Sequence, residues 1–174
     1  YPLKYITRAE VITILDNAIK KLCNEPKEYN GNVSGTVIIN TSNVTIKDME
    51  IKGDLIISEG VGNGNVVLNN TNVLGNTIVR GGGDKSIYIE GNSKISNLLI
   101  NKTDEGAIRI KTSAGVIIDS TVVEDTKNNV ILEGSFNNIN VSNGKNITLT
   151  NCKIEKLEVN SENSSLEVSE NAEI

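Results

Sequence analysis

Aliphatic and polar residues alternate along most of this chain in short runs, and the runs recur about every 20 residues. NVSGTVII (32–39), EIKGDLII (50–57) and NVLGNTIV (72–79) each place an aliphatic residue and a spacer before a glycine, and an alternating aliphatic run after it. They start at residues 32, 50 and 72, hence 18 and 22 residues apart. A repeat of this length is typical of a solenoid, in which each repeat forms one turn.

Each repeat contains three short strands of period two, separated by Gly, Asn, Ser and Asp, with no helix-length segment between them. The pattern predicts a right-handed, three-faced parallel β-helix of about six or seven coils, stacked at ~4.8 Å. Glycines 35, 53 and 75 mark the corner where the second strand bends into the third, which favours a residue without a Cβ atom. The first strands are 43–46, 65–68, 87–89, 108–110, 130–132, 147–149 and 166–168. The inward residues of the second strands are Met49/Ile51, Thr71/Val73, Ser93/Ile95, Ala114/Val116, Phe136, Cys152/Ile154 and Ala172/Ile174, and those of the third are Leu55/Ile57, Thr77/Val79, Leu98/Ile100, Thr121/Val123, Ile139/Val141 and Leu157/Val159.

The N-terminal segment has a different period. Thr7 and Glu10 form a capping box, and Val11, Leu15, Ala18 and Leu22 follow at helical spacing. We therefore expect a helix ending near Leu22 that caps the first coil, or else lies along the third-strand face. The expected organisation is a helical cap over 1–24, a linker over 25–31 and a β-helix over 32–174. We expect the repeat to run to the last residue without a cap, and the natural protein to extend beyond both ends of this sequence.

Composition narrows the class of protein. The chain has 174 residues, 3% aromatics and no His, so Val, Ile and Leu must fill the core, which suits strands. A net charge of −5 without a basic stripe argues against nucleic-acid binding. No apolar run approaches the roughly 20 residues of a membrane span. Cys152 occupies an inward position and Cys23 precedes the first coil, about five rungs away, so we expect free thiols and no disulfide.

Two segments resemble a known family. ITRAEVITILDNAIKKL (6–22) resembles the last helix of an S-layer homology (SLH) repeat, and residues 45–89 resemble the β-helical region that adjoins such repeats in surface proteins of Gram-positive bacteria. The resemblance implies an extracellular protein of the cell wall or S-layer. It also implies that neighbouring SLH repeats bind cell-wall polysaccharide, with Arg8 of this motif involved.

One segment raises the possibility of an enzyme. Ile108-Arg109-Ile110-Lys111 resembles the RIK motif of polygalacturonases, which also need a cluster of aspartates and a histidine. This chain has neither a His nor an Asp-Asp pair, so we expect no catalysis and place a lyase or hydrolase a distant third. Tyr88, Arg109 and Lys111 remain candidates for sugar binding on the first-strand face.

Acidic residues recur in the loops between third and first strands. Stacked coils could align them into a row that holds calcium, although Lys85, Lys102 and Lys127 lie among them and can balance their charge. We therefore expect no metal or other cofactor, with calcium as the alternative. The triple glycine 81–83 is not a phosphate loop, because no helix follows it. The candidate acidic residues are Glu59, Asp84, Asp104, Glu105, Glu124 and Asp125.

Outward positions of the third strands form an aliphatic stripe over five consecutive coils. The stripe comprises Ile38, Ile56, Ile78, Leu99 and Val122, and polar Asn140 and Glu158 follow it. An exposed apolar strip of this kind marks a contact site, for a second copy or an adjacent domain. The sequence favours a non-catalytic, wall-associated spacer or packing module, with a polysaccharide-binding β-helix as the alternative.

Overall fold

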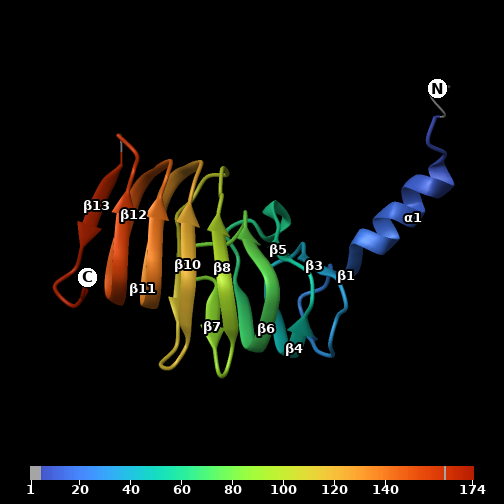
Figure 1. Ribbon diagram of the computed structural model, residues 1–174, viewed down its shortest axis with the longest axis horizontal. Coiled ribbons are helices and arrows are strands. Elements are labelled where there is room, and N and C mark those ends of the chain that lie inside the picture. Colours follow the sequence, from blue (N-terminus) through green and yellow to red (C-terminus); the bar gives the residue numbers. More distant parts are fainter. Residues whose placement is uncertain (1–4, 163) are drawn as a thin grey trace.

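The computed structural model describes residues 5–162 and 164–174, and it shows a parallel β-solenoid of about seven turns with one short helix at its N-terminal end (Figure 1). Every strand pairing in the described residues is parallel. The elements are α1 (Arg8–Ala18), β1 (Ile19–Cys23), β2 (Glu28–Tyr29), β3 (Thr36–Ile39), β4 (Val44–Ile51), β5 (Leu55–Ile57), the short 3-10 helix η1 (Glu59–Val61), β6 (Val66–Val79), β7 (Tyr88–Glu90), β8 (Lys94–Ile100), β9 (Ile108–Thr112), β10 (Ile117–Val123), β11 (Thr126–Val141), β12 (Gly144–Val159) and β13 (Ser165–Val168).

Strand pairing produces the three predicted faces. The third face contains β1, β3, β5, the end of β6, β8, β10, and the ends of β11 and β12. The first face runs from β2 through the starts of β4 and β6 to β7, β9, β11, β12 and β13. The second face is formed by the end of β4, the middle segments of β6, β11 and β12, and the starts of β8 and β10. β13 and the bridge between Lys153 and Glu173 continue the repeat into the last coil, as expected.

The core consists of aliphatic columns inside the solenoid. On the third face, Ile39, Ile57, Val79, Ile100, Val123 and Val141 are paired in sequence and fully buried. Burial of such side chains contributes about 1.5–3 kcal/mol each before the entropy of ordering the chain is subtracted. The alternation of aliphatic and polar residues that predicted the coils therefore corresponds directly to the inside and outside of the solenoid.

The corner glycines are needed because consecutive coils approach closely there. Gly53 donates its N–H to the carbonyl of Gly35, and Gly75 donates to that of Gly53. A Cβ atom on Gly53 would lie 2.6 Å from the carbonyl carbon of Gly35, and one on Gly75 would lie 2.6 Å from the carbonyl oxygen of Gly53. The predicted corner is confirmed, and its cause at Gly53 and Gly75 is backbone contact between stacked coils, whereas a Cβ atom on Gly35 would meet the side chain of Lys20.

The predicted N-terminal boundaries are wrong. The capping box of Thr7 and Glu10 is present, but α1 ends at Ala18, and Ile19–Cys23 forms β1 in parallel register with β3. Backbone pairing with β3 therefore overrides the helical period of Leu15, Ala18 and Leu22. The solenoid begins at Ile19, and the segment 25–31, expected as a linker, contains β2 and belongs to the first coil.

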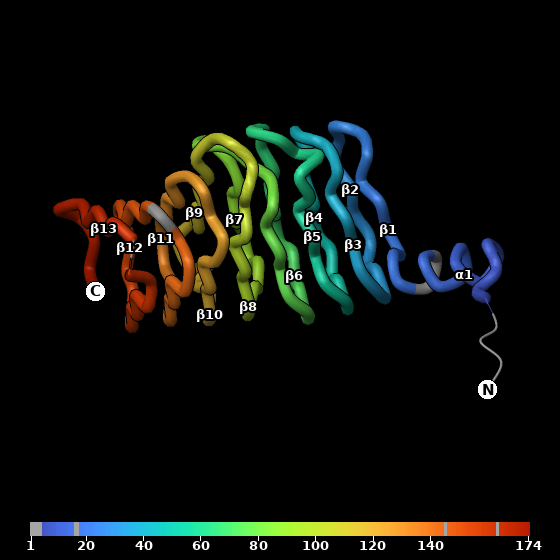
Figure 2. Tube along the Cα trace, turned by 90° about the horizontal axis from the view of Figure 1, so that it is seen from above, coloured from blue at the N-terminus to red at the C-terminus, as the bar shows by residue number. Residues whose placement is uncertain are grey.

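The helix occupies neither of its expected positions. Figure 2 shows α1 continuing beyond the first coil, and all of its described side chains are exposed. It therefore neither covers the end of the solenoid nor lies along the third face. The reason is that no loop separates Ala18 from Ile19, so the chain cannot turn back without breaking β1.

One coil is shifted by two residues from the predicted alignment. Tyr88 of β7 pairs with Lys111 of β9, where the sequence pattern placed Arg109. The inward residues of the next strand are accordingly Val116 and Ile118, whereas Ala114, which the pattern placed inside, is exposed. A shift of two residues keeps the same side chains inside and outside, so alternation alone does not detect it.

Several threonines are buried inside the solenoid, and the hydroxyls of three of them, Thr71, Thr77 and Thr121, differ in bonding. The Thr71 hydroxyl lies 3.2 Å from the carbonyl oxygens of Ile46 and Asn69, to which it can donate. The hydroxyls of Thr77 and Thr121 are buried with no hydrogen-bond partner in the described residues. An unpaired buried hydroxyl lowers stability, whereas a paired one contributes to it.

These threonines allow a matched test on one strand. We expect Thr77→Val to raise the free energy of unfolding by about 1 kcal/mol, because it removes an unpaired hydroxyl from an apolar column. Thr71→Val should lower the same quantity by about 1 kcal/mol, because it removes a made hydrogen bond. Both residues lie in β6 and are fully buried. Urea unfolding of the two variants measures the difference, and equal effects would contradict the assignment.

Both cysteines are free and buried, so the expectation of no disulfide is confirmed. Cys23 does not precede the first coil as expected. It lies inside that coil and pairs with Ile39. Burial raises the pKa of Cys23 to about 11 and also raises the pKa of Cys152. Because thiolates are the reactive form, both thiols should be inert in the folded protein.

Candidate contact surface

The predicted aliphatic stripe is a continuous ladder on the third face, and it is longer than expected. Strand register pairs each member with the next, and Leu22 of β1 extends the ladder by one rung before Ile38. We call this set of six residues the third-face ladder: Leu22, Ile38, Ile56, Ile78, Leu99 and Val122. The ladder ends where Val122 pairs with Asn140, and Asn140 with Glu158.

Sequence reasoning missed Leu22 because it also fits the helical series that starts at Val11. The sequence offers no clear strand signal there, because Lys21 interrupts the apolar alternation between Ile19 and Cys23, although it pairs with the buried Val37. In the structure, Leu22 is 50% exposed and the other five ladder residues are half-buried. Their side chains point outward between two buried columns of the same strands.

Polar side chains border the ladder, and part of it is hollowed. A groove of about 390 Å³ runs along the rungs of Ile78, Leu99 and Val122. Its edges are formed by Asn76, Asn97, Ser120 and Glu124. An apolar centre with a rim of mainly uncharged polar groups is the usual anatomy of a protein contact surface.

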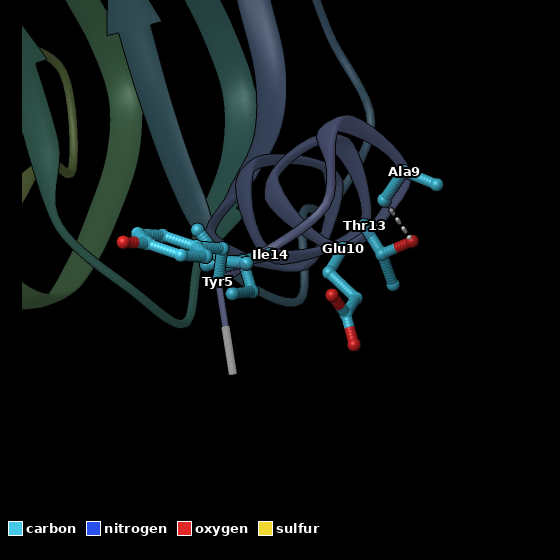
Figure 3. Close-up of a pocket in the computed structure, with 6 residues that line it drawn as sticks. Tyr5, Ala9, Glu10, Thr13 and Ile14 are labelled. Carbon is cyan, nitrogen blue, oxygen red and sulfur yellow. Dashed lines mark hydrogen bonds between the residues drawn. The ribbon is translucent and has the colours of Figure 1, made fainter. Parts of the chain in front are cut away.

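A second apolar surface belongs to α1 itself. Tyr5, Ile6, Ala9, Thr13 and Ile14 surround an open hollow beside the helix (Figure 3), and Thr13 donates its hydroxyl proton to the carbonyl of Ala9 at 2.9 Å. This hollow is formed by the helix and the residues just before it, and its single carboxylate belongs to Glu10, which the capping box uses. The described residues that line this hollow therefore bring no set of polar groups together.

The candidate sugar-binding residues lie on the first face, where their charges are paired. Arg109 Nη1 lies 3.0 Å from Glu133 Oε2, and Lys111 Nζ lies 2.9 Å from Glu133 Oε1. The Glu133 side chain is only 14% exposed, so this ion-pair cluster is partly shielded from water. Tyr88 stands beside Lys111 in the neighbouring coil. These ion pairs join β9 to β11, so the charges of Arg109 and Lys111 stabilise the stacking of two coils.

Glu133 was missed, because its role depends on two cations of the preceding coil, and the sequence alone does not show this pairing. Arg8 is the first residue of α1 and lies exposed beside Ile6, Val11 and Ile12. The structure thus does not bring Arg8 together with the first-face cluster.

The acidic loop residues do not assemble into a site. Glu59 pairs with Arg80 at 3.7 Å, Asp125 accepts a hydrogen bond from Asn143 at 2.6 Å, and Glu124 borders the third-face groove. Asp84, Asp104 and Glu105 are exposed. Within residues 5–162 and 164–174, no three His, Cys, Asp or Glu side chains lie close enough to share a metal ion.

Wider comparison adds no further assignment. Among the described residues, no helix has both the length and the apolar character needed to cross a membrane. No protein-family model matches the chain, and neither a curated protein nor a solved structure shows a significant match to it.

Proposed function

We propose that this chain is a non-catalytic structural module of a cell-wall-associated bacterial surface protein, and that its third face binds a second copy of the module. The observation that carries the proposal is the third-face ladder, six aliphatic side chains in unbroken register. On a face that only contacts water these positions would be polar, as Asn140 and Glu158 are in the following coils. The extracellular location is supported by the resemblance of residues 6–22 to an SLH helix.

A second copy suits the ladder because it has the same period. Two ladders with rungs ~4.8 Å apart stay in step along their whole length, so their side chains can interdigitate, as they do between stacked sheets. The two copies would use the same surface, which is the arrangement of a twofold dimer. Six rungs span about 24 Å. That surface is small for a permanent interface, so we expect a weak, concentration-dependent dimer.

Lysine substitutions in the ladder test this proposal. We expect Ile56→Lys combined with Ile78→Lys to convert the dimer into a monomer by light scattering over a concentration series, because buried unpaired ammonium groups oppose association. The matched control is Val67→Lys, since Val67 lies in β6 with Ile78 but points outward on the first face. A wild-type protein that stays monomeric at its highest soluble concentration would refute the contact.

Titration with sugars separates this proposal from the polysaccharide-binding alternative. Because Glu133 already pairs with Arg109 and Lys111, we expect no heat when wall polysaccharide or acidic plant polysaccharide is titrated into the isolated chain. Heat that disappears in a Tyr88→Ala and Lys111→Ala double variant would instead assign sugar binding to the first face.

A further inference from the structure

A buried lysine occupies the corner between the third and first strands. Lys102 is 2% exposed, although lysine is among the residues that are least often buried. Its Nζ atom lies 2.7 Å from the carbonyl oxygen of Glu105, 3.1 Å from that of Gly106, 3.3 Å from that of Asp104 and 3.3 Å from Asn63 Oδ1. Four oxygens from two loops therefore surround one nitrogen.

The chemistry of these four oxygens is that of a cation site. Each is a neutral carbonyl or amide oxygen that can only accept, so the group at the centre must donate protons or carry positive charge. Rings of such oxygens replace the hydration shell of alkali-metal ions in proteins. The exposed carboxylates of Asp104 and Glu105 are not among these contacts, which disfavours a divalent ion such as calcium.

We propose that residues 101–106 together with Asn63 form a monovalent cation cage, whose natural occupant is the ammonium group of Lys102. When the side chain is shortened, the same cage takes a free potassium or small primary ammonium ion. Burial lowers the pKa of Lys102 below its ordinary value, and the nearby Asp104 carboxylate offsets only part of this effect. The surrounding oxygens must therefore compensate for the lost hydration of the charge.

The cage joins coils that are not adjacent. Asn63 belongs to the loop after η1, and Lys102 to the loop after β8, with the loop 80–86 between them. The triple glycine of that intervening loop is buried, and a Cβ atom on Gly83 would lie 2.2 Å from the backbone oxygen of Asn63. The glycines thus keep the middle loop narrow enough for its neighbours to meet.

The geometry at Gly106 and Asn128 supports the same assignment. Gly106 has a φ of +96°, and a Cβ atom there would lie 2.5 Å from Asn63 Oδ1, so glycine lets the carbonyls turn toward Lys102. Asn128 of the next coil donates its amide to the Asp104 carbonyl at 3.1 Å. Two loops therefore meet at the ammonium group, and Asn128 of β11 ties the next coil to one of them, which would stiffen this corner of the solenoid.

The test compares cations of different size in a variant with an empty cage. The amides of Asn101 and Arg109 flank the loop and bond to the carbonyls of Val79 and Gly83, so their hydrogen exchange reports on it. In Lys102→Ala we expect both amides to exchange about tenfold faster than in the wild type. Potassium or methylammonium chloride should restore slow exchange, whereas tetramethylammonium chloride at equal ionic strength should not, because that ion is too large.

Two controls keep the result decisive. In Lys102→Met the side chain fills the same space without a charge and blocks the cage. The amides of Asn101 and Arg109 should therefore exchange fast in every salt. Should Lys102→Ala not fold, Asn63→Ala keeps the lysine but removes one oxygen, and it should speed exchange at Arg109. Two results would overturn the proposal. One is that these amides of Lys102→Ala exchange at the same rate in potassium and in tetramethylammonium chloride. The other is that they exchange at the wild-type rate in Lys102→Met or Asn63→Ala.

Discussion

Replacing Gly53 by alanine is expected to destabilise the solenoid by about 3 kcal/mol, because the new methyl group overpacks a contact between two backbones. The ideal Cβ position lies 2.6 Å from the carbonyl carbon of Gly35, 2.7 Å from the Thr36 nitrogen and 2.9 Å from the Gly35 oxygen. No flexible side chain can move aside there. The coils must separate, which weakens the hydrogen bond from Gly53 to Gly35.

Gly31 provides the matched control. It has a φ of +84°, and a Cβ atom there would meet no other atom within 4 Å. Gly31→Ala should therefore destabilise by only about 1 kcal/mol, the expense of holding an L-residue in a left-handed conformation. Urea unfolding followed by circular dichroism measures both variants. If Gly31→Ala were the more harmful change, the coil-contact explanation of the corner glycines would be wrong.

The repeat predicted most of this fold because its period determines which residues stack. Met49, Thr71 and Val73 lie inside as the alternation required, and so do the inward residues of the third strands up to Val141. Each coil repeats the same choice of inside and outside. The assignment of inward and outward residues is therefore supported by several coils independently, and a wrong register in one coil leaves the assignment of the others unchanged.

The predictions failed where two periods or two registers fit equally well. Residues 19–23 satisfy both a helix and a strand, and pairing with β3 decides for the strand. The loop 80–87 contains the triple glycine and places Ile87 at a φ of +42°, after which Tyr88 pairs two residues further along β9 than expected. Loop conformation sets this register, and alternation carries no information about it.

The third-face ladder was predicted only in part. Strand alternation identifies five of its six residues, whereas Leu22 was missed because residues 19–23 were assigned to the helix. The ion pairs of Glu133 and the cage around Lys102 depend on contacts between loops and coils far apart in sequence. Such contacts follow from three-dimensional stacking and leave no local pattern.

The second large effect is expected at Phe136, the only phenylalanine of the chain and a fully buried residue. It pairs with Ile118 in the coil before and with Ile154 in the coil after, and its own coil has Gly134 at the adjacent inward position. Phe136→Ala should lower the free energy of unfolding by about 4 kcal/mol, because the coil spacing is set by backbone pairing and the walls cannot collapse into the cavity. Phe136→Leu, which keeps most of the volume, should lower it by about 1 kcal/mol.

Which strands lose protection from hydrogen exchange in Phe136→Ala is more informative than the total loss of unfolding free energy. In a solenoid each coil contacts mainly its neighbours, so a weak interface lets the coils on its shorter side open first. In Phe136→Ala we therefore expect hydrogen exchange to rise strongly in β11, β12 and β13, while β4 and β6 keep wild-type protection. Phe136→Leu should show the same gradient with smaller amplitude. Uniform loss of protection from β3 to β13 would mean that the solenoid unfolds as a single cooperative unit, and the nearest-neighbour description of its stability would have to be abandoned.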